Sequence, residues 1–211
     1  MPKTHLRTEY SRDRLEESDA GTDPLALFER WFDDAVQAAG RDPNAMSLAT
    51  VDAHGQPDVR IVLCKQFDVR GFVFFTNYDS RKGEQLADNP KACLLFYWPA
   101  LERQVRVKGA ASRIPASESD AYFDQRPLDA RIGAWASPQS HPIPDRTHLE
   151  QSVAAAAQRF AGAVPPRPTH WGGYRLEATS FEFWQGRPSR LHDRLVFTRP
   201  DGAWVRERLA P

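Results

Sequence analysis

The chain has 211 residues, enough for one large domain or two small ones without disulfides or metals in place of a core. Its 28 Lys and Arg side chains balance 28 Asp and Glu side chains, which excludes the global positive field typical of proteins held on nucleic acid. No apolar stretch approaches the ~18 residues of a membrane span, and the start lacks the apolar core of a secretory signal. We therefore expect a cytoplasmic protein with no nucleic-acid or membrane partner, in which any anion site is local.

Composition separates an N-terminal arm from the rest of the chain. Residues 1–22 carry many charges and few large apolar side chains, which predicts an arm that is mobile or ordered by what it touches. Asp23 and Pro24 form an N-cap and first-turn pair, and apolar residues then recur at helical spacing until Gly40. No repeat or linker splits the remainder, so we predict a single domain over 23–211.

Short apolar segments separated by turns begin at Met46. We predict strands over 46–51, 60–67, 71–77, 91–98, 103–114, 174–186, 190–199 and 203–209. We predict helices over 80–90, 117–123, 127–135 and 145–160. Strands that follow one another through turns predict a mainly β chain with added helices, as an antiparallel barrel rather than a parallel sheet.

One group of cations lies near the end of the chain. Arg190, His192 and Arg194 are spaced by two on a predicted strand, which directs all three side chains to one face. Such a face indicates either a bound anion or an edge strand whose charges discourage aggregation. The preceding segment EFWQG offers an aromatic ring, an amide and a glycine, which favour the wall of a pocket for a planar anionic ligand.

Two basic pairs flank earlier strands. Arg60 and Lys65 stand near the two ends of one predicted strand and, by strict alternation, face opposite sides, so they bind different groups unless a bulge intervenes. Arg81 and Lys82 begin a short helix, where free N–H groups and the helix dipole favour an anion such as phosphate. The alternative for the second pair is a solvated helix start.

Two weaker signals lie between these groups. Tyr122 and Arg126 are four residues apart near a helix end and can offer a hydroxyl and a guanidinium to one phosphate. Arg126 can equally interact with the helix C-terminus. Gln104, among β-branched neighbours, indicates either a cross-strand hydrogen bond or a contact to the polar edge of a heterocycle.

The motifs of several enzyme classes are missing. The sequence has no GxGxxG, Walker loop, GxSxG or HExxH motif, and no histidine or acidic cluster with the spacing of metal ligands. Cys64 and Cys93 are far apart and are expected to be buried free thiols. Cations, amides and aromatic rings orient ligands but perform little redox chemistry, so an enzyme built from them would need a cofactor.

Several unlinked motifs occur in one order along the chain: RIVLCK, FFTNYDSRKGEQLADNP, LERQVRVKG, YFDQRP, IGAWASPQS, HWGGYRL, EFWQG, RLHDR and the terminal RLAP. Together they resemble the pyridoxine/pyridoxamine 5′-phosphate oxidases, from about Leu25 to Pro211, with a weaker match at LRTEY. The RLHDR and RLAP pair is more particular to these oxidases than to other FMN-binding split barrels.

The resemblance implies an α+β homodimer of antiparallel split β-barrels with FMN at the subunit interface. It implies oxidation of pyridoxamine and pyridoxine 5′-phosphate to pyridoxal 5′-phosphate, by hydride transfer from substrate C4′ to flavin N5, with dioxygen reduced to hydrogen peroxide. The enzyme would then serve vitamin B6 salvage. Two rival hypotheses are a related FMN oxidase of another planar acid, such as a phenazine precursor, and a non-catalytic module that binds flavin or pyridoxal phosphate.

The same resemblance assigns cofactor contacts by motif. FMN contacts from one subunit are expected at Arg60, Ile61, Val62, Leu63, Cys64, Lys65, Phe75, Thr76, Arg81, Lys82 and Gln104. Matching contacts from the second subunit are expected at Gln139, Ser140, Trp184 and Arg194. Arg60 and Lys82 are expected to hold the FMN phosphate, and no metal is expected.

Substrate contacts are assigned in the same way, at Arg7, Tyr10, Lys65, Tyr122, Arg126, Arg190 and His192. Lys65, Tyr122 and Arg126 resemble a phosphate clamp. Arg190 and His192 are expected over the pyridine ring as catalytic residues, and Asp42 matches a position near the active site. Many relatives have a serine where this chain has Ala130, which removes one hydroxyl contact to the substrate phosphate.

Overall fold

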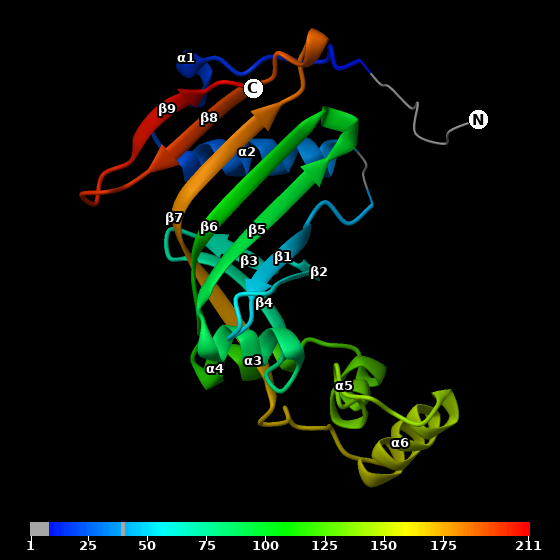
Figure 1. Ribbon diagram of the computed structural model, residues 1–211. Coiled ribbons are helices and arrows are strands. Elements are labelled where there is room, and N and C mark those ends of the chain that lie inside the picture. Colours follow the sequence, from blue (N-terminus) through cyan, green and yellow to red (C-terminus); the bar gives the residue numbers. More distant parts are fainter. Residues whose placement is uncertain (1–8, 39–40) are drawn as a thin grey trace. The chain divides into compact units, whose positions relative to one another are not determined.

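The computed structural model describes residues 9–38 and 41–211 and is drawn in Figure 1. Its helices are α1 Glu17–Ala20, α2 Pro24–Gln37, α3 Arg81–Asp88, α4 Ala116–Phe123, α5 Leu128–Ala136 and α6 Arg146–Arg159. Its strands are β1 Ala45–Val51, β2 Pro57–Leu63, β3 Gln66–Asp68, β4 Gly71–Asn77, β5 Lys91–Trp98, β6 Arg103–Arg113, β7 Trp171–Gln185, β8 Asp193–Thr198 and β9 Val205–Leu209. Within the described residues, no helix has both the length and the apolar character needed to cross a membrane.

The strands form one sheet with the hydrogen-bonded order β2-β1-β5-β6-β7-β4-β3, and β8 and β9 continue from β7. The pairs β3–β4, β4–β7, β7–β8 and β8–β9 are all antiparallel. The sheet therefore confirms the antiparallel, mainly β fold that the alternation of strands and turns predicts.

The chain divides into two compact units whose segments interleave along the sequence. Unit 1 consists of Met1–Leu48, Cys93–Gly109 and Ala178–Pro211, and unit 2 of Ala49–Ala92 and Ala110–Glu177. Strands β1, β5, β6 and β7 each give residues to both units. The predicted boundary between an arm over 1–22 and a single domain over 23–211 stays a prediction.

Unit 1 packs α2 against its strands. The helix begins as predicted, because the Asp23 side chain accepts a hydrogen bond from the Leu25 N–H and Pro24 fills the first turn. It ends at Gln37, and Ala39 and Gly40 lie outside the described residues. Its buried Phe28 lies 4.9 Å from the Phe96 ring of β5, and Trp31 lies 5.3 Å from Phe183 of β7, both edge to face.

Residues 9–20 lie along the C-terminal strands of unit 1. Glu17 receives two hydrogen bonds from Arg208, at 2.6 and 2.8 Å, and these hold the pKa of the Glu17 carboxyl down at about 2. Asp193 accepts a hydrogen bond from the Leu15 N–H at 3.1 Å. The described part of the predicted arm is therefore tied to β8 and β9.

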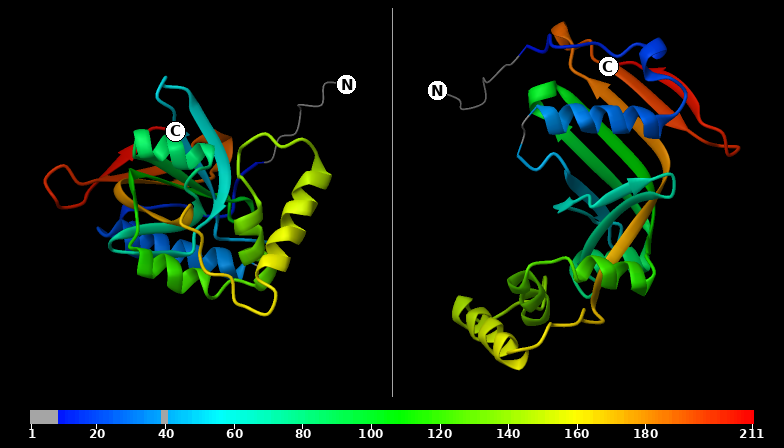
Figure 2. Two further views of the ribbon diagram at one scale, coloured as in Figure 1. Left: turned by 90° about the horizontal axis from the view of Figure 1, so that it is seen from below. Right: turned by 180° about the vertical axis from the view of Figure 1, so that it is seen from behind.

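Unit 2 contains the rest of the sheet and the helices α3 to α6, and Figure 2 shows α5 and α6 side by side. Strand β4 pairs with the start of β7, with Phe74 opposite Tyr174 and Asn77 opposite Trp171. The predicted helices over 117–123, 127–135 and 145–160 are confirmed within a residue or two as α4, α5 and α6.

Two predicted strands differ from the structure: one is interrupted, and the other begins later than predicted. The predicted strand over 60–67 ends at Leu63 and resumes at Gln66, so the strict alternation that would turn Arg60 and Lys65 to opposite faces does not hold across Cys64 and Lys65. Because the strand is interrupted between Leu63 and Gln66, the side chains of Arg60 and Lys65 can both face one ligand cavity.

The predicted strand over 190–199 is wrong at its start, because β8 begins only at Asp193. Pro188–Arg190 form a 3-10 turn, closed by a hydrogen bond from the Leu191 N–H to the Pro188 carbonyl at 3.1 Å. Ser189 and Arg190 have positive φ of 57° and 62°, which a strand does not accommodate. Arg190, His192 and Arg194 therefore do not share one strand face, and only Arg194 lies on the strand.

Gly83 of α3 provides a test of packing in unit 2. A Cβ at this position would clash with the Tyr78 backbone carbonyl, whereas nothing lies within 4 Å of a Cβ built on Gly133 of α5. Gly83→Ala is expected to lower the free energy of unfolding by about 1–3 kcal/mol. Gly133→Ala should leave it unchanged or raise it by up to about 1 kcal/mol. Urea unfolding compares the two, and equal effects would contradict the packing of α3.

Candidate functional site

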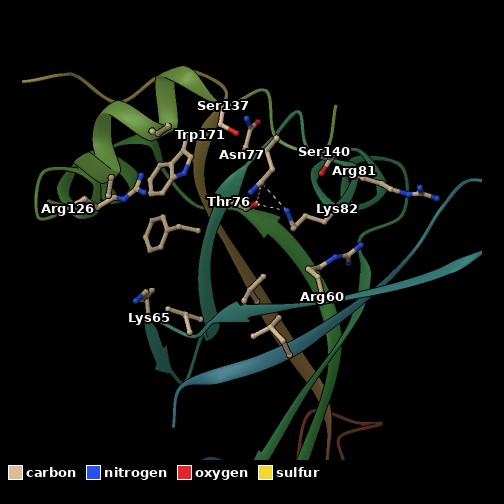
Figure 3. Close-up of a pocket in the computed structure, with 18 of the residues that line it drawn as sticks. Arg60, Lys65, Thr76, Asn77, Arg81, Lys82, Arg126, Ser137, Ser140 and Trp171 are labelled. Atoms are coloured by element: carbon tan, nitrogen blue, oxygen red, sulfur yellow. Dashed lines mark hydrogen bonds between the residues drawn. The ribbon is translucent and has the colours of Figure 1, made fainter. Parts of the chain in front are cut away.

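A cavity of about 900 Å³ lies within unit 2, walled by β2, the end of β4, the start of α3, and α5 with the loop after it (Figure 3). It is lined by Asp58, Val59, Arg60, Ile61, Val62, Leu63, Lys65, Phe75, Thr76, Asn77, Arg81, Lys82, Tyr122, Arg126, Ala130, Gly133, Ala134, Ser137, Gln139, Ser140 and Trp171. Five of these residues are basic and one is acidic. The cavity is therefore suited to anionic ligands.

Lys82 is a buried cation held by neutral groups. Its Nζ donates hydrogen bonds to the Thr76 hydroxyl at 3.2 Å, the Ser80 hydroxyl at 3.1 Å and the Gln139 Oε1 at 3.0 Å. Within the described part of the chain, no carboxylate forms an ion pair with it. Burial, with a smaller contribution from Arg60, lowers the pKa of Lys82 from its ordinary 10.5 to about 8.

Arg60 and Arg81 share one carboxylate beside Lys82. The Asp58 Oδ2 lies 2.7 Å from Nη2 of Arg60 and 3.4 Å from Nε of Arg81. Arg60 also donates to the Thr50 hydroxyl at 2.6 Å and to the Gln85 Oε1 at 3.1 Å, and burial lowers the pKa of its guanidinium. Three cations around one carboxylate leave an excess positive charge that can hold a dianionic group such as a phosphate.

A second cationic group lies at the other end of the cavity, where Figure 3 shows Lys65 and Arg126 away from Arg60, Arg81 and Lys82. The Arg126 guanidinium carbon lies 4.5 Å from the centre of the Trp171 ring. Its Nη1 is buried and has no hydrogen-bond partner among the described residues, and burial lowers the pKa of the guanidinium. Tyr122 lies in the same lining and stacks on Phe75 at 3.8 Å between ring centres.

The lining also contains apolar side chains, namely Phe75, Val62 and the exposed Val59, Ile61 and Leu63 of β2. Apolar side chains with polar groups at both ends can hold flat molecules that each carry an anionic tail. Cys64 does not line the cavity: its side chain is buried, which raises its pKa to about 12. The predicted FMN contact of Cys64 therefore cannot be made by its buried thiol.

The loop after α5 contributes Gln139 and Ser140. Gln139 Oε1 accepts hydrogen bonds from both Lys82 and Thr76, and Ser140 adopts a positive φ of 72°. The resemblance assigns these two residues to the second subunit, but they line the cavity that also holds Arg60 and Lys82 of the same chain. Within one chain, Gln139 therefore lies against the Lys82 cation, and the assignment of these two residues to the second subunit stays a prediction.

A second group of the predicted residues lies in unit 1. The His192 ring lies 4.6 Å from Trp184 and 5.7 Å from Tyr10, and Tyr10 lies 5.6 Å from Trp184. The Arg187 N–H donates to the His192 Nδ1 at 3.1 Å, which leaves Nε2 as the protonated nitrogen of the neutral ring. Burial, and next Arg190, lower the pKa of His192, so the ring is neutral at physiological pH.

Arg194 is fixed by a buried carboxylate. Glu182 Oε1 accepts from Nε and Nη2 of Arg194 at 3.1 and 3.0 Å, and the other oxygen of Glu182 pairs with Arg106. The Nη1 of Arg194 donates to the Ala210 carbonyl at 2.8 Å. Arg190 is exposed on its turn, beyond this network.

Three predicted residues remain to be placed: Gln104, Asp42 and Arg7. Gln104 lies on β6, partly exposed, on the same face as Arg106. Asp42 is exposed with a φ of 53°, and its carbonyl accepts from the Ala45 N–H at 2.8 Å. Arg7 lies outside the described residues. Residues 9–38 and 41–211 contain no group of three or more His, Cys, Asp or Glu side chains that could hold a metal ion.

Three important residues were not predicted as parts of the site. Asp58 lies two residues before Arg60, the first residue of the RIVLCK motif. An acidic residue so close to a cation in sequence is the signal that could have identified it as the partner of Arg60. Trp171 lies in the quoted motif HWGGYRL but received no role, because its ring contacts are with distant segments. Glu182 opens EFWQG, where the aromatic ring rather than the carboxylate drew attention.

The pKa of Lys82 predicts a pH effect on the stability of the anion-free protein. Between pH 8 and 10.5 the unfolded chain retains a proton that folded Lys82 releases, so stability rises with pH by up to about 1.4 kcal/mol per unit. In Lys82→Met this component should vanish, whereas Lys91→Met, at an exposed site, should keep the wild-type slope. Urea unfolding at pH 7.5 to 10 in phosphate-free buffer measures it, and identical slopes for all three proteins would contradict the burial of a charged Lys82.

Two family models match the chain. Residues 32–160 match the family described as "Pyridoxamine 5'-phosphate oxidase". Residues 171–211 match "Pyridoxine 5'-phosphate oxidase C-terminal dimerisation region", a match that supports a homodimer. Tyr122, Arg126 and the cations of β2 and α3 lie in the first region, and Trp184, Arg190, His192 and Arg194 lie in the second.

Curated relatives match over nearly the whole chain. The pyridoxine/pyridoxamine 5′-phosphate oxidase of Bordetella avium is 60% identical over 213 residues and covers 100% of both chains. The protein of the same name from Pseudomonas paraeruginosa is 59% identical over 208 residues, covering 98% of this chain and 97% of the relative. Among solved structures, PhzG from Burkholderia lata in complex with tetrahydrophenazine-1-carboxylic acid superposes with a TM-score of 0.89 at 33% identity, covering 95% of this chain and 100% of PhzG.

The matched fold is therefore the split barrel of these proteins. From its sequence and its fold, the chain belongs to the pyridoxine/pyridoxamine 5′-phosphate oxidase family of enzymes.

Proposed function

We propose that this enzyme oxidises pyridoxamine 5′-phosphate and pyridoxine 5′-phosphate to pyridoxal 5′-phosphate, with FMN as cofactor and dioxygen as acceptor. The observation behind this proposal is one cavity with two separate cationic ends, which suits two flat molecules that each bear a phosphate. The names of the curated relatives support the same substrates.

FMN fits the end of the cavity formed by Arg60, Arg81 and Lys82. These three cations carry more positive charge than the single negative charge of Asp58 can neutralise. The described partners of Lys82 are neutral hydroxyl and amide oxygens, so a phosphate there would supply the missing negative charge. Thr76, Gln139 and Ser140 line the same end and can donate hydrogen bonds to it. Held there, FMN would supply the hydride acceptor at N5 for the substrate C4′ and the route for two electrons to dioxygen, giving hydrogen peroxide. With the amine substrate, water would replace the amino group, which would leave as ammonia.

Lys65, Tyr122 and Arg126 are proposed to bind the substrate phosphate. Arg126 has a buried Nη1 without a partner among the described residues, and an incoming phosphate oxygen would satisfy this donor. Tyr122 can add its hydroxyl, and Lys65 adds a flexible charge from the break between β2 and β3. Because this cluster and the FMN cluster lie at different ends, the two phosphates would not compete.

A second copy of the chain is proposed to complete the site. Trp184, Arg190, His192 and Arg194 all lie in the matched dimerisation region, which supports their role at the partner's cavity. Arg194 is held in place by Glu182, so its orientation needs no ligand. Tyr10 packs on both Trp184 and His192 and would reach the substrate with them, whereas the proposed contact of Arg7 concerns a residue outside the described part.

Arg190 and His192 are proposed as the residues over the substrate ring. The planar guanidinium of Arg190 can stack on the ring and attract its charge, which a lysine ammonium would do poorly. His192, neutral and protonated at Nε2, can donate a hydrogen bond from that atom to the oxygen or nitrogen on C4′. Asp42 is kept as a proposed residue near the site on resemblance alone.

The PhzG neighbour raises the alternative of an oxidase acting on a planar carboxylic acid. A carboxylate could also pair with Arg126, but it carries one negative charge, whereas a phosphate carries up to two and offers three oxygens to Lys65, Tyr122 and Arg126 together. The site therefore favours the phosphorylated substrates. Bound flavin without turnover of either phosphorylated vitamer would favour the alternative.

The purified yellow protein is expected to release hydrogen peroxide with each phosphorylated vitamer, and substrate added without oxygen should bleach its flavin. Arg190→Ala should retain the flavin but lower kcat/KM by about 10²-fold, because the ring is no longer held in reactive geometry. Arg146→Ala removes an exposed arginine of α6 and should leave kcat/KM unchanged. Loss of flavin in Arg190→Ala, or unchanged kinetics, would contradict the assigned role.

Ala130 lines the cavity, and the family resemblance leads us to expect a serine at this position. Ala130→Ser would restore a hydroxyl near the substrate phosphate, and a net hydrogen bond of about 0.5–1.5 kcal/mol lowers KM by roughly 2- to 10-fold. Steady-state kinetics with pyridoxine 5′-phosphate measures this, with the flavin content as a control. An unchanged or higher KM would show that the phosphate does not lie beside residue 130.

A further inference from the structure

Three aromatic rings at the second cationic end have nearly parallel planes and stack on one another, and we call this stack the aromatic layer. Phe75 of β4 stacks on Tyr122 of α4 at 3.8 Å and 10°, and on Trp171 of β7 at 5.4 Å and 10°. Tyr122 and Trp171 are 6.2 Å apart at an angle of 6°. Three separate chain segments thus meet in a layer that lines the cavity.

Arg126 lies over one face of this layer. Its guanidinium carbon is 4.5 Å from the Trp171 ring centre and 5.4 Å from that of Phe123, and no carboxylate pairs with it in the described part of the chain. A cation–π contact fixes the plane of a guanidinium without occupying its N–H groups. The contact with Trp171 therefore leaves these donors without a protein acceptor among the described residues, in agreement with the buried, unpartnered Nη1.

Arg103 in unit 1 also lies over a tryptophan ring, but its N–H groups are bound to protein acceptors. Its guanidinium carbon lies 4.5 Å from the Trp31 ring centre, but its N–H groups donate to Asp13, Asp34 and Gln185 at 2.6 to 2.8 Å. That arginine is fully engaged within the protein. At Trp171 the same ring contact occurs without such acceptors: no hydrogen bond from the Arg126 guanidinium to a described residue is present.

Trp171 is itself rigidly held. It is 8% exposed, it is paired with Asn77 in the β4–β7 ladder, and its carbonyl accepts from Arg167 at 2.7 Å. Its ring meets Phe123 edge to face at 5.2 Å. An indole fixed on both sides can set the position of a long, flexible arginine side chain, whose ordering would otherwise cost entropy on binding.

We propose that Trp171 is a positioning residue for the substrate: its indole holds the Arg126 guanidinium, and with Phe75 it holds the Tyr122 ring, in the arrangement that receives the substrate phosphate. This inference deepens the proposed function and rests on it. Trp171 acts through Arg126 and lies away from the Arg60 and Lys82 end in Figure 3. Its loss should therefore raise KM and leave both kcat and FMN content nearly unchanged.

The experiment uses the FMN-loaded full chain and pyridoxine 5′-phosphate, with inorganic phosphate as a competitive inhibitor. Trp171→Leu should raise KM and the inhibition constant of phosphate by about 3- to 30-fold, and Trp171→Phe, which keeps a weaker ring, by roughly 2- to 5-fold. Trp204→Leu removes the ring beneath another arginine, Arg199, at 5.1 Å outside the cavity, and should change neither constant.

A double-mutant cycle separates positioning from simple structural loss. In an Arg126→Ala background, Trp171→Phe should raise KM much less than in the wild type, because Arg126 is gone and only the contact of residue 171 with the Tyr122 and Phe75 rings remains. Additive effects, or a fall in kcat with KM unchanged, would overturn the inference, and the cycle decides even if Trp171→Leu does not fold. Absence of turnover in the wild type would instead refute the proposed function. Calorimetric titration of inorganic phosphate into the FMN-loaded wild type and the Trp171 variants would then test the positioning role, and equal affinities would overturn it.

Discussion

The cavity of unit 2 depends on an excess of buried positive charge that its own lining does not neutralise. Arg60 and Arg81 share Asp58, and Lys82 donates to oxygen atoms of Thr76, Ser80 and Gln139. An isolated buried charge costs several kcal/mol, and the lowered pKa of Lys82 is the direct sign of that cost. A bound phosphate offsets the cost, so the same residues that weaken the free protein make anion binding favourable.

The sheet places these charges where an irregular backbone allows it. Strand β2 ends at Leu63, and the two residues before β3 release Lys65 from the alternation that would send it away from Arg60. Helix α3 begins shortly after β4, which brings Lys82 back to Thr76 of that strand. The cations of the site therefore come from β2, from the break that follows it and from the first turn of α3.

The periodic parts of the chain were predictable from sequence, and the irregular parts were not. Helix α2 and strands β4 and β5 follow from regular apolar spacing, and the cationic character of the site follows from Arg60, Arg81 and Lys82. The prediction that Arg190 lies on a strand was wrong. Ser189 and Arg190 both have positive φ, a local conformation that the alternation of residue types does not reveal. Trp171 and Asp58 were missed because their roles arise from contacts with segments distant in sequence or from a shared charge.

The partners of each arginine distinguish structural cations from cations available to a ligand. Arg103 and Arg194 both bind carboxylates, and such arginines join segments of unit 1. Within the described residues, the Arg126 guanidinium meets aromatic faces, and its buried donor has no partner. The formal charge of zero conceals this division, because the structural arginines hold acidic partners while the lining of the cavity contains one carboxylate. The local pairing of charges, rather than their total, therefore indicates which cations are available to an anionic ligand.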